Sequence, residues 1–305
     1  MIAIINFYVL CLSFFLLPIS AHLSLIVLIA ALIGVIFQAQ KFSWAFMYKP
    51  TPLLLIALLV TFLYGITYSI LTRPQALDFL TQYFQLTSIL LITPLIFKFK
   101  AQSLQLHYAY LLGCIGLMVM ILFKHIPDNS AIILFFASYT ALTLARSYQG
   151  WKCWAYTSLC LAIFGFALWS SGAFTFHPSE FMSLRNTAIA NAQNTLILWK
   201  QQPVIGHGTG SFVNAYFNNQ ALSQNTFYTL LVNHGIIGLG LFLGLLVYLL
   251  QGLQLRRDRS NLKLGAIFIL TMILGSFSTD ILLSTPARLW FILWFSYLLA
   301  QTIDK

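Results

Sequence analysis

An arginine and a glycine-rich turn lie close together in the most polar stretch of the sequence. Arg185 comes before the segment 203–212, in which Gly206, Gly208 and Gly210 occupy alternate positions. A guanidinium group pairs two phosphate oxygens at once. Glycines permit positive φ, and successive backbone N–H groups in such a turn can cradle an anion. Together these features predict a site for a phosphate or diphosphate group.

Five side chains in or near this stretch are candidates for moving a proton. They are His177, Glu180, His207, His234 and Asp280. Histidine and carboxyl groups can be tuned to titrate near the working pH, as a general base requires. A histidine on an apolar helix is more often a satisfied structural residue, and this is the competing interpretation of His234.

The composition indicates a chain whose main solvent is lipid. Of its 305 residues, 60% are hydrophobic and 7% are charged, whereas a soluble domain carries about 25% charged residues. The net charge of +10 is scattered between apolar runs, so no nucleic-acid binding is predicted. The four cysteines lack metal-site spacing, and the glycine segment lacks the GK[ST] of a nucleotide loop. Neither a metal nor another cofactor is therefore expected.

Ten apolar runs are long enough to cross about 30 Å of hydrocarbon. They cover residues 2–18, 23–39, 52–71, 79–97, 106–123, 130–147, 154–171, 227–253, 264–283 and 287–302. We expect an all-α polytopic membrane protein with about ten transmembrane helices, in a single integral membrane domain over 1–305. A signal peptide cleaved after Ala21 is the alternative for the first run, but no Lys or Arg precedes that run. No matching broken helices, which would indicate a transporter, are expected in the two halves.

The basic residues alternate between the two sides of these runs. The richer set of connections contains Lys41, Lys49, Lys98, Lys100, Arg146, Lys152, Arg256, Arg257, Arg259, Lys263 and Lys305. Cytoplasmic connections of membrane proteins carry an excess of basic residues. This pattern predicts a bacterial inner-membrane protein with both termini in the cytoplasm. The loop 172–226 then faces the periplasm.

The loop 172–226 is expected to carry the chemistry, because the other connections are short. The apolar spacing over 183–200 predicts a short amphipathic helix on the membrane surface. Arg185 lies in its first turn, and an exposed arginine of no consequence is the alternative there. Asn225 is expected to cap a helix that begins at Thr226.

Two further arginines, Arg73 and Arg288, are expected at the same membrane face as Arg185. Three cations there suit an anionic lipid headgroup, whereas the competing interpretation is that Arg73 and Arg288 merely snorkel to lipid phosphates. Asp280 is expected near the outward end of the run 264–283, where an ionisable group indicates function by default. A structural ion pair with Arg288 is the alternative.

The order of these motifs resembles the O-antigen ligase-like (WaaL/Wzy-type) polytopic membrane glycosyltransferases. The motifs are an arginine on a short helix, P-x-x-G-x-G-x-G-S-F from Pro203, and a returning helix that contains H-G-I-I-G-L from His234. The detailed likeness covers about residues 184–244, and elsewhere only the topology is similar.

This resemblance implies a GT-C-like helical bundle that transfers a glycan from an undecaprenyl-diphosphate carrier at the outer face of the membrane. The acceptor is lipid A-core in ligases, another lipid-linked repeat in polymerases, and a protein hydroxyl in a third group. The ligase is ranked first, the polymerase second and the protein O-oligosaccharyltransferase third. The implied partners are the lipid-linked donor, the acceptor glycan and membrane lipids, with neither metal nor cofactor.

The resemblance also assigns roles to individual residues. Arg185 matches the family's loop arginine, which is thought to hold the diphosphate. His207, Gly208 and Gly210 match its glycine motif, and Asn225 matches the second residue of a His-Asn pair before the returning helix.

One departure from the family pattern concerns the general base. Gln224 stands where the family commonly has the histidine of that pair, and an amide has no useful pKa. The role then passes to one of His207, His177, Glu180, His234 and Asp280. The other interpretations are a branch with a different acceptor, or an inactive chain.

Two classes of protein other than enzymes compete with this interpretation. A transporter or flippase for a lipid-linked glycan is disfavoured, because the runs are nearly free of charge apart from Asp280. A purely structural role does not account for an arginine, a glycine motif and a polar loop in this order.

Overall fold

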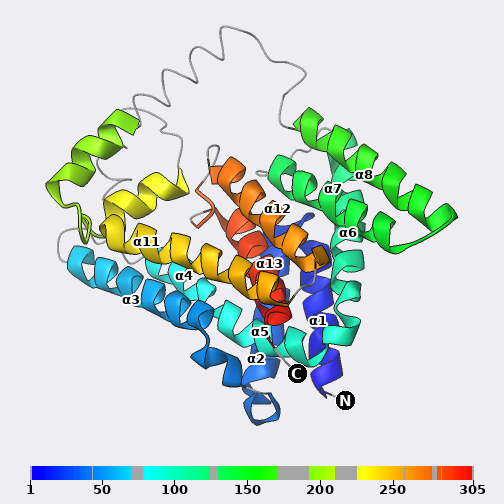
Figure 1. Ribbon diagram of the computed structural model, residues 1–305, viewed down its shortest axis with the longest axis horizontal. Coiled ribbons are helices and arrows are strands. Elements are labelled where there is room, and N and C mark those ends of the chain that lie inside the picture. Colours follow the sequence, from blue (N-terminus) through cyan, green and yellow to red (C-terminus); the bar gives the residue numbers. More distant parts are fainter. Residues whose placement is uncertain are drawn as a thin grey trace, which may run out of the picture.

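Helices occupy all ten apolar runs expected from the sequence. The computed structural model describes residues 2–42, 44–70, 78–123, 130–170, 192–209, 225–256, 259–276, 280–282 and 284–303. The α-helices are α1 (Ile2–Leu16), α2 (Ala21–Ile36), α3 (Pro50–Ile70), α4 (Asp78–Leu86), α5 (Ser88–Lys98), α6 (Leu104–Leu122), α7 (Ser130–Ser147), α8 (Trp151–Ser170), α11 (Thr226–Leu255), α12 (Arg259–Ser276) and α13 (Thr285–Gln301). Residues 192–201 are also helical. No strand occurs within these ranges (Figure 1), so the all-α prediction is confirmed for them.

Four of the described helices are long and apolar enough to cross a membrane. These segments are Pro50–Ser69, Lys100–Leu122, Trp151–Trp169 and Thr226–Leu255. Shorter apolar helices cover Ala3–Leu16, Ala21–Ile36 and Ile133–Ala145. Length and composition thus indicate an all-helical membrane protein, while the count of ten spans stays a prediction.

Three of the expected runs differ from the helices observed. The run 79–97 forms two helices, α4 and α5, with Thr87 between them, and α12 ends at Ser276 rather than at residue 283. The helix α11 is kinked at Gly235, where φ is 64° and ψ is −163°. The two interruptions differ in kind, because Thr87 keeps right-handed helical φ and ψ whereas Gly235 does not. The expectation that no matching broken helices occur in the two halves stays a prediction. The kink at Gly235 is possible because glycine has no Cβ to exclude this conformation.

The last helix, α13, lies at the centre of the bundle. It packs against α2, α5, α7, α11 and α12 (Figure 1). Every residue from Ala287 to Gln301 is buried, including the large side chains of Trp290 and Trp294. A helix that is apolar on all sides can be surrounded in this way. By contrast, α8 packs mainly on α7, and its Trp154 side chain is 75% exposed.

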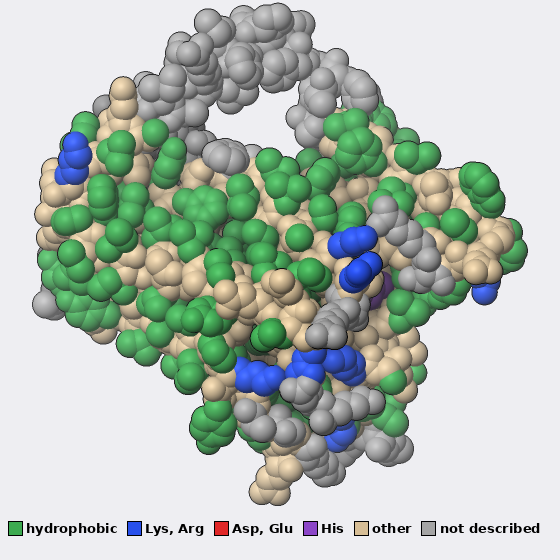
Figure 2. All heavy atoms as spheres, viewed as in Figure 1, with side chains coloured by type: hydrophobic (Ala, Val, Ile, Leu, Met, Phe, Trp, Pro, Cys, Tyr) green, Lys and Arg blue, Asp and Glu red, His purple; other side chains and the backbone are tan. Residues whose placement is uncertain are grey.

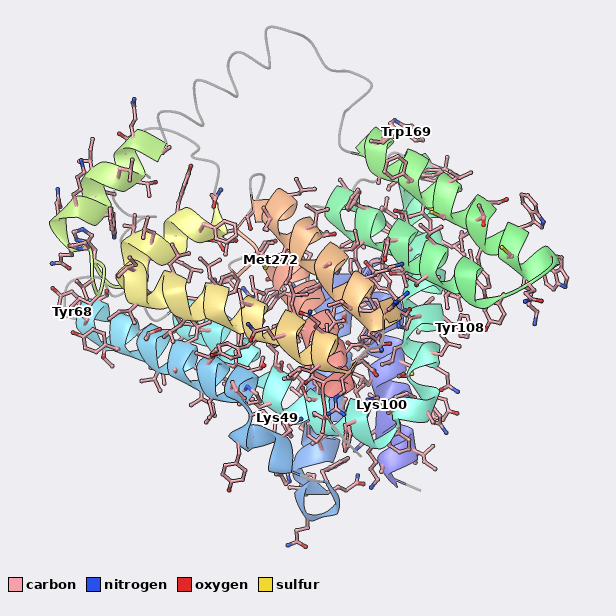
Figure 3. All side chains as sticks on the ribbon, in the orientation of Figure 1. Lys49, Tyr68, Lys100, Tyr108, Trp169 and Met272 are labelled. Carbon is pink, nitrogen blue, oxygen red and sulfur yellow. The ribbon has the colours of Figure 1, made fainter. Side chains whose placement is uncertain are left out.

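Basic side chains gather around the C-terminal end of α13. Lys49, Lys100 and Arg256 all donate hydrogen bonds to backbone carbonyls of residues 301–303. Basic side chains are visible on the surface in the lower part of the view (Figure 2). Lys49 and Tyr68 mark the two opposite ends of α3 (Figure 3). The glycine-rich turn lies at the Tyr68 end.

Candidate functional site

The glycine-rich turn at 203–209 docks into the break in α11. The His207 N–H donates to the Val232 carbonyl at 2.8 Å. The Gly208 N–H donates to the Asn233 carbonyl at 3.0 Å. These carbonyls belong to the end of the first half of α11, where the kink removes their intrahelical partners. The turn therefore caps the first half of the broken helix.

The same turn also caps the second half of α11. The Ile236 N–H donates to the Pro203 carbonyl at 3.0 Å, and the Ile237 N–H donates to the Val204 carbonyl at 3.3 Å. These N–H groups follow the kink at Gly235 and lack helical acceptors of their own. The broken ends are thus satisfied by backbone groups of residues 203–208, which holds this part of the loop to the bundle.

Close packing explains why the turn contains glycines. Gly206 and Gly208 have φ of 73° and 85°, so the expected positive φ is confirmed at both. A Cβ on Gly206 would lie 2.5 Å from the Gly235 nitrogen, and one on Gly208 would collide with the Ser69 hydroxyl. On α11, a Cβ at Gly235 would collide with the Val204 carbonyl. The turn and the kink therefore require one another.

The backbone N–H groups of this turn are already bonded within the protein. In addition to the two bonds of His207 and Gly208, the Gly206 N–H donates to the Gln202 carbonyl at 3.1 Å. The Thr209 N–H donates to the Gly65 carbonyl of α3, also at 3.1 Å. The expectation that Gly206 and Gly208 cradle an anion is therefore wrong for this conformation. Gly210 lies outside the described residues.

His207 is held between the turn and the helix at 192–201. Its Nε2 lies 2.7 Å from the Leu198 carbonyl. A carbonyl only accepts, so Nε2 must carry the proton, and the neutral ring has its basic lone pair on Nδ1. The Trp199 indole N–H also ties this helix to the turn through the Pro203 carbonyl at 3.0 Å. The ring of His207 is only partly buried, which leaves it accessible from outside.

Asn225 caps the returning helix, as the sequence predicts. Its Oδ1 accepts from the N–H groups of Phe227 and Tyr228 at 2.9 and 3.4 Å, and α11 begins at Thr226. These are two of the N–H groups that a helix leaves without intrahelical partners. The amide oxygen therefore has a structural task that is independent of any role in catalysis.

Replacing Asn225 by alanine is expected to lower the free energy of unfolding by about 1 kcal/mol, the usual cost of a lost N-cap. Asn225→Ser is the matched control, because a serine hydroxyl also caps. The measurement is thermal unfolding of the purified protein in detergent. Equal losses for the two variants would show that the amide is needed for something other than the cap.

A buried polar cluster joins the start of α11 to the connection before α13. The Thr226 hydroxyl donates to Asp280 Oδ1 at 3.3 Å and accepts from the Ile281 N–H at 2.8 Å. The same Asp280 oxygen accepts from the Leu282 N–H at 3.0 Å. Asp280 is fully buried and precedes α13. It lies in the connection, beyond the end of α12 at Ser276, rather than within the helix expected at 264–283.

Arg288 extends this cluster to α4. Its guanidinium donates to Gln85 Oε1 and the Leu282 carbonyl, both at 2.8 Å, and to the Thr285 hydroxyl at 3.4 Å. The side chain is 2% exposed and attracts the nearby charge of Asp280. The interpretation that Arg288 snorkels to lipid phosphates is therefore wrong. The arginine helps to hold three segments of the bundle together.

His234 packs inside the bundle beside the kink. Its ring centroid lies 4.7 Å from that of Phe62, and its Nε2 is 3.4 Å from the Tyr83 hydroxyl. The side chain is 3% exposed, and a Cβ on Gly65 would lie 2.8 Å from its ring. This packing favours the structural interpretation of His234.

Two partners in these clusters, Tyr83 and Gln85, were not among the residues expected at the site. Both lie on α4, the least apolar of the helices in the expected spans. The sequence does contain a signal for them, because residues 78–86 include several polar side chains. A helix that contacted only lipid would not favour such side chains. Their specific partners come from chain segments more than a hundred residues away.

The structure brings only part of the expected site together. Asn225, Asp280 and Arg288 belong to one end of the bundle and are linked through Thr226 and Leu282. His207 and His234 lie on either side of the junction between the glycine turn and α11. The remaining expected residues are outside the described ranges: Arg73, His177, Glu180, Arg185, Gly210 and Gln224.

Comparison with models of protein families and with curated protein sequences gives no match to the chain. Over the described residues the fold defines the class as a helical protein, with four helices there long and apolar enough to span a membrane. Within the described residues, the site consists of a loop segment docked in a broken helix, beside a buried polar cluster.

Proposed function

We propose that this protein transfers a glycan from an undecaprenyl-diphosphate carrier to an acceptor at the outer face of a bacterial inner membrane. Ligation to lipid A-core is the first candidate reaction. The proposal includes ten membrane spans, cytoplasmic termini and a periplasmic loop over 172–226. The observation that carries it is the docking of the glycine turn into the break of α11. This docking gives a structural reason for the glycine motif, which resembles that of the O-antigen ligase-like proteins.

Catalysis by positioning requires groups that are fixed before the substrate arrives. His207 is fixed by its bonds to Leu198 and Val232, while Asn225 is fixed by its cap on α11. Both ends of the segment 210–224 are therefore anchored on the same kinked helix. A rigid frame of this kind suits an active site built on a loop.

In the proposed reaction, an acceptor hydroxyl attacks the anomeric carbon of the carrier-linked sugar. The new C–O bond forms as the bond to the diphosphate breaks, and the lipid diphosphate leaves with both electrons. Arg185 pairs the charge that builds on this leaving group. A base takes the hydroxyl proton, and the candidates are His207, through Nδ1, and Glu180. Asp280 and Arg288 act as positioning residues in the frame.

Replacing Arg185 by alanine is expected to reduce glycan transfer by roughly 100-fold or more, because a donor to the developing charge is lost. Lys200→Ala is the matched control, since it removes a cation exposed near the end of the described helix at 192–201. The measurement is transfer from a carrier-linked glycan by purified protein, together with lipopolysaccharide laddering in cells. Full activity of Arg185→Ala at normal protein levels would show that Arg185 does not stabilise the diphosphate leaving group.

The acceptor can be identified by deleting the gene in its native host. A ligase predicts loss of long-chain lipopolysaccharide while polymerised glycan accumulates on the carrier. A polymerase predicts accumulation of single repeats instead. Changes confined to glycoproteins would indicate a protein O-oligosaccharyltransferase.

A transporter of lipid-linked glycan is the second candidate function. The interruptions at Thr87 and Gly235 favour it, because discontinuous helices often form transport sites. In transporters the broken helix ends face the cargo, whereas here the turn 203–209 occupies both ends at Gly235. This difference supports the enzyme as the first candidate. Reconstituted vesicles decide between them, since a transporter moves intact lipid-linked glycan without changing it chemically.

A further inference from the structure

Four branched apolar side chains are exposed where the glycine turn meets α11. Val204 and Ile205 belong to the turn. Ile236 and Ile237 directly follow the kink of the helix. All four are between 41% and 56% exposed. The hydrogen bonds that close the second half of α11 join the two pairs, so the four side chains belong to one surface, the turn surface. A contiguous exposed apolar surface of this kind marks a place of contact.

The turn surface continues into the exposed side of α11. Leu243 and Val247 on this helix are also about half exposed. Together with Ile236 they occupy positions i, i+7 and i+11, which lie on one side of a helix. Because α11 is long and apolar enough to span a membrane, this side is suited to contact the acyl chains of lipids. Val204 and Ile205 extend the same side beyond the helix.

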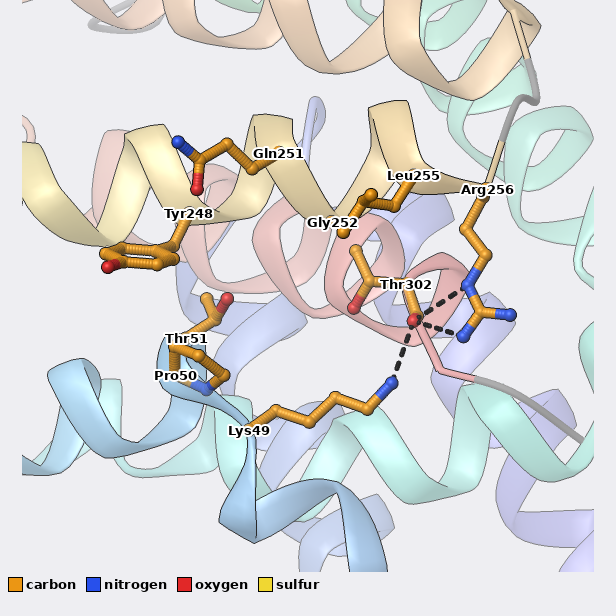
Figure 4. A pocket seen from close by; sticks show the side chains of 9 residues that line it. All are labelled: Lys49, Pro50, Thr51, Tyr248, Gln251, Gly252, Leu255, Arg256 and Thr302. Carbon is orange, nitrogen blue, oxygen red and sulfur yellow. Dashed lines mark hydrogen bonds between the residues drawn. The ribbon is translucent and has the colours of Figure 1, made fainter.

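The length of α11 beyond its kink indicates how deep the turn surface lies. Residues 236–255 rise about 30 Å at about 1.5 Å per residue, and the hydrocarbon core is about 30 Å thick. Arg256 follows this stretch, and together with Lys49 it bonds to the Thr302 carbonyl beside a cavity of about 410 Å³ (Figure 4). Charged side chains are costly within hydrocarbon, so these cations mark one edge of it. Ile236 then lies at the other edge.

Two tyrosines on α3 mark the same edge as Ile236. The rings of Tyr64 and Tyr68 stack with their centroids 6.3 Å apart, and both side chains are half exposed. Tyrosines are enriched where hydrocarbon meets water. The Thr209 N–H donates to the Gly65 carbonyl between them, and a Cβ on Gly208 would lie 3.0 Å from the Tyr68 ring. The glycine turn is therefore held at the level of this aromatic pair.

We propose that the turn surface is immersed in the acyl chains of one membrane leaflet, at the edge of the hydrocarbon core. Its partner is the phospholipid of the leaflet at the Tyr68 end of α3 (Figure 3). The glycine turn thus lies in the membrane boundary and not in open water. The adjoining His207 ring, which is only partly buried, lies at the level of the lipid headgroups. This proposal concerns the position of the turn and does not depend on glycan transfer.

The test is the reaction of single cysteines with a membrane-impermeant maleimide. The full chain is placed in lipid nanodiscs after its four native cysteines have been replaced by alanine. Ile205→Cys is expected to react roughly tenfold more slowly than Lys200→Cys, because hydrocarbon disfavours the reactive thiolate. Lys200 is the matched control, since it is exposed on the neighbouring helix at 192–201. Val247→Cys is expected to react at least as slowly as Ile205→Cys. Equal rates for Ile205→Cys and Lys200→Cys would overturn the proposal.

A photoreactive side chain identifies what covers the turn surface and does not require the cysteine-free chain. Ile205→benzoylphenylalanine in the otherwise native chain is irradiated in the same nanodiscs, and its adducts are weighed by mass spectrometry. We expect a phospholipid adduct there and a much weaker one for Lys200→benzoylphenylalanine. A cross-link within the chain, or to a second copy, in place of the lipid adduct would overturn the proposal. No glycan is present in either measurement, so failure here leaves the proposed glycan transfer untouched.

Discussion

Replacing Gly235 by alanine is expected to lower the free energy of unfolding by about 3 kcal/mol or more. The backbone there has φ of 64° and ψ of −163°, a conformation almost restricted to glycine. A Cβ would also collide with the Val204 carbonyl, which belongs to the turn that fills the break. Alanine would therefore strain the kink and expel the turn at the same time.

The change is measured by thermal unfolding in detergent, where we expect a Tm roughly 5 to 10 °C lower. Gly240→Ala is the matched control on the same helix, because a Cβ at Gly240 meets no atom within 4 Å. Gly240→Ala is expected to leave the Tm unchanged or slightly higher, since alanine favours a helix. If the two variants unfold at the same temperature, the kink does not depend on Gly235.

Replacing Arg288 by methionine is expected to cost about 2 to 4 kcal/mol, because each buried acceptor that loses its donor costs about 1 to 3 kcal/mol. The guanidinium is 2% exposed and bonds to Gln85, to the Leu282 carbonyl and to Thr285. Its removal would leave these acceptors unpaired and the buried Asp280 without a nearby positive charge. The measurement is again thermal unfolding, with Arg259→Met on an exposed position of α12 as the control.

Adding Asp280→Asn to Arg288→Met tests the electrostatic part of this expectation. Neutralising Asp280 removes the uncompensated charge, so the double variant should be at least about 1 kcal/mol more stable than the sum of the two single effects predicts. Strictly additive effects would mean that Arg288 acts only through Gln85 and the backbone carbonyls. Because stability is measured without substrate, either result reports the structural role of Arg288 and Asp280 and not a role in catalysis.

The positions of the helices could be predicted from the sequence with little error. A segment that crosses lipid must be apolar and must pair its own backbone groups in a helix. The helices α2, α3, α6 and α7, which are 16 to 21 residues long, accordingly each match one apolar run of the sequence. The cap at Asn225 was also predictable, since an asparagine before an apolar run is a local signal. The positive φ of Gly206 and Gly208 follows from the same kind of local reasoning.

The partners of the polar groups could not be predicted. The glycine turn looked like an open anion site, but the N–H groups of His207 and Gly208 bond to carbonyls that are freed by the kink at Gly235. Arg288 was expected to bind an anionic headgroup at the outward membrane face, whereas it is buried against a glutamine about two hundred residues earlier. In both cases the competing acceptor comes from a distant segment, and no local pattern reports which segments pack together.

The sequence by itself determined that this protein is helical, apolar enough for a membrane, and polar chiefly in one loop. These properties follow from composition and from the need of each segment to satisfy its own backbone in lipid. The tertiary structure alone decided that α13 is central, that the turn 203–209 closes the break in α11, and that Lys49 and Arg256 share a cavity. A uniformly apolar helix presents the same surface to lipid and to protein, so its neighbours are decided by packing and by rare polar contacts.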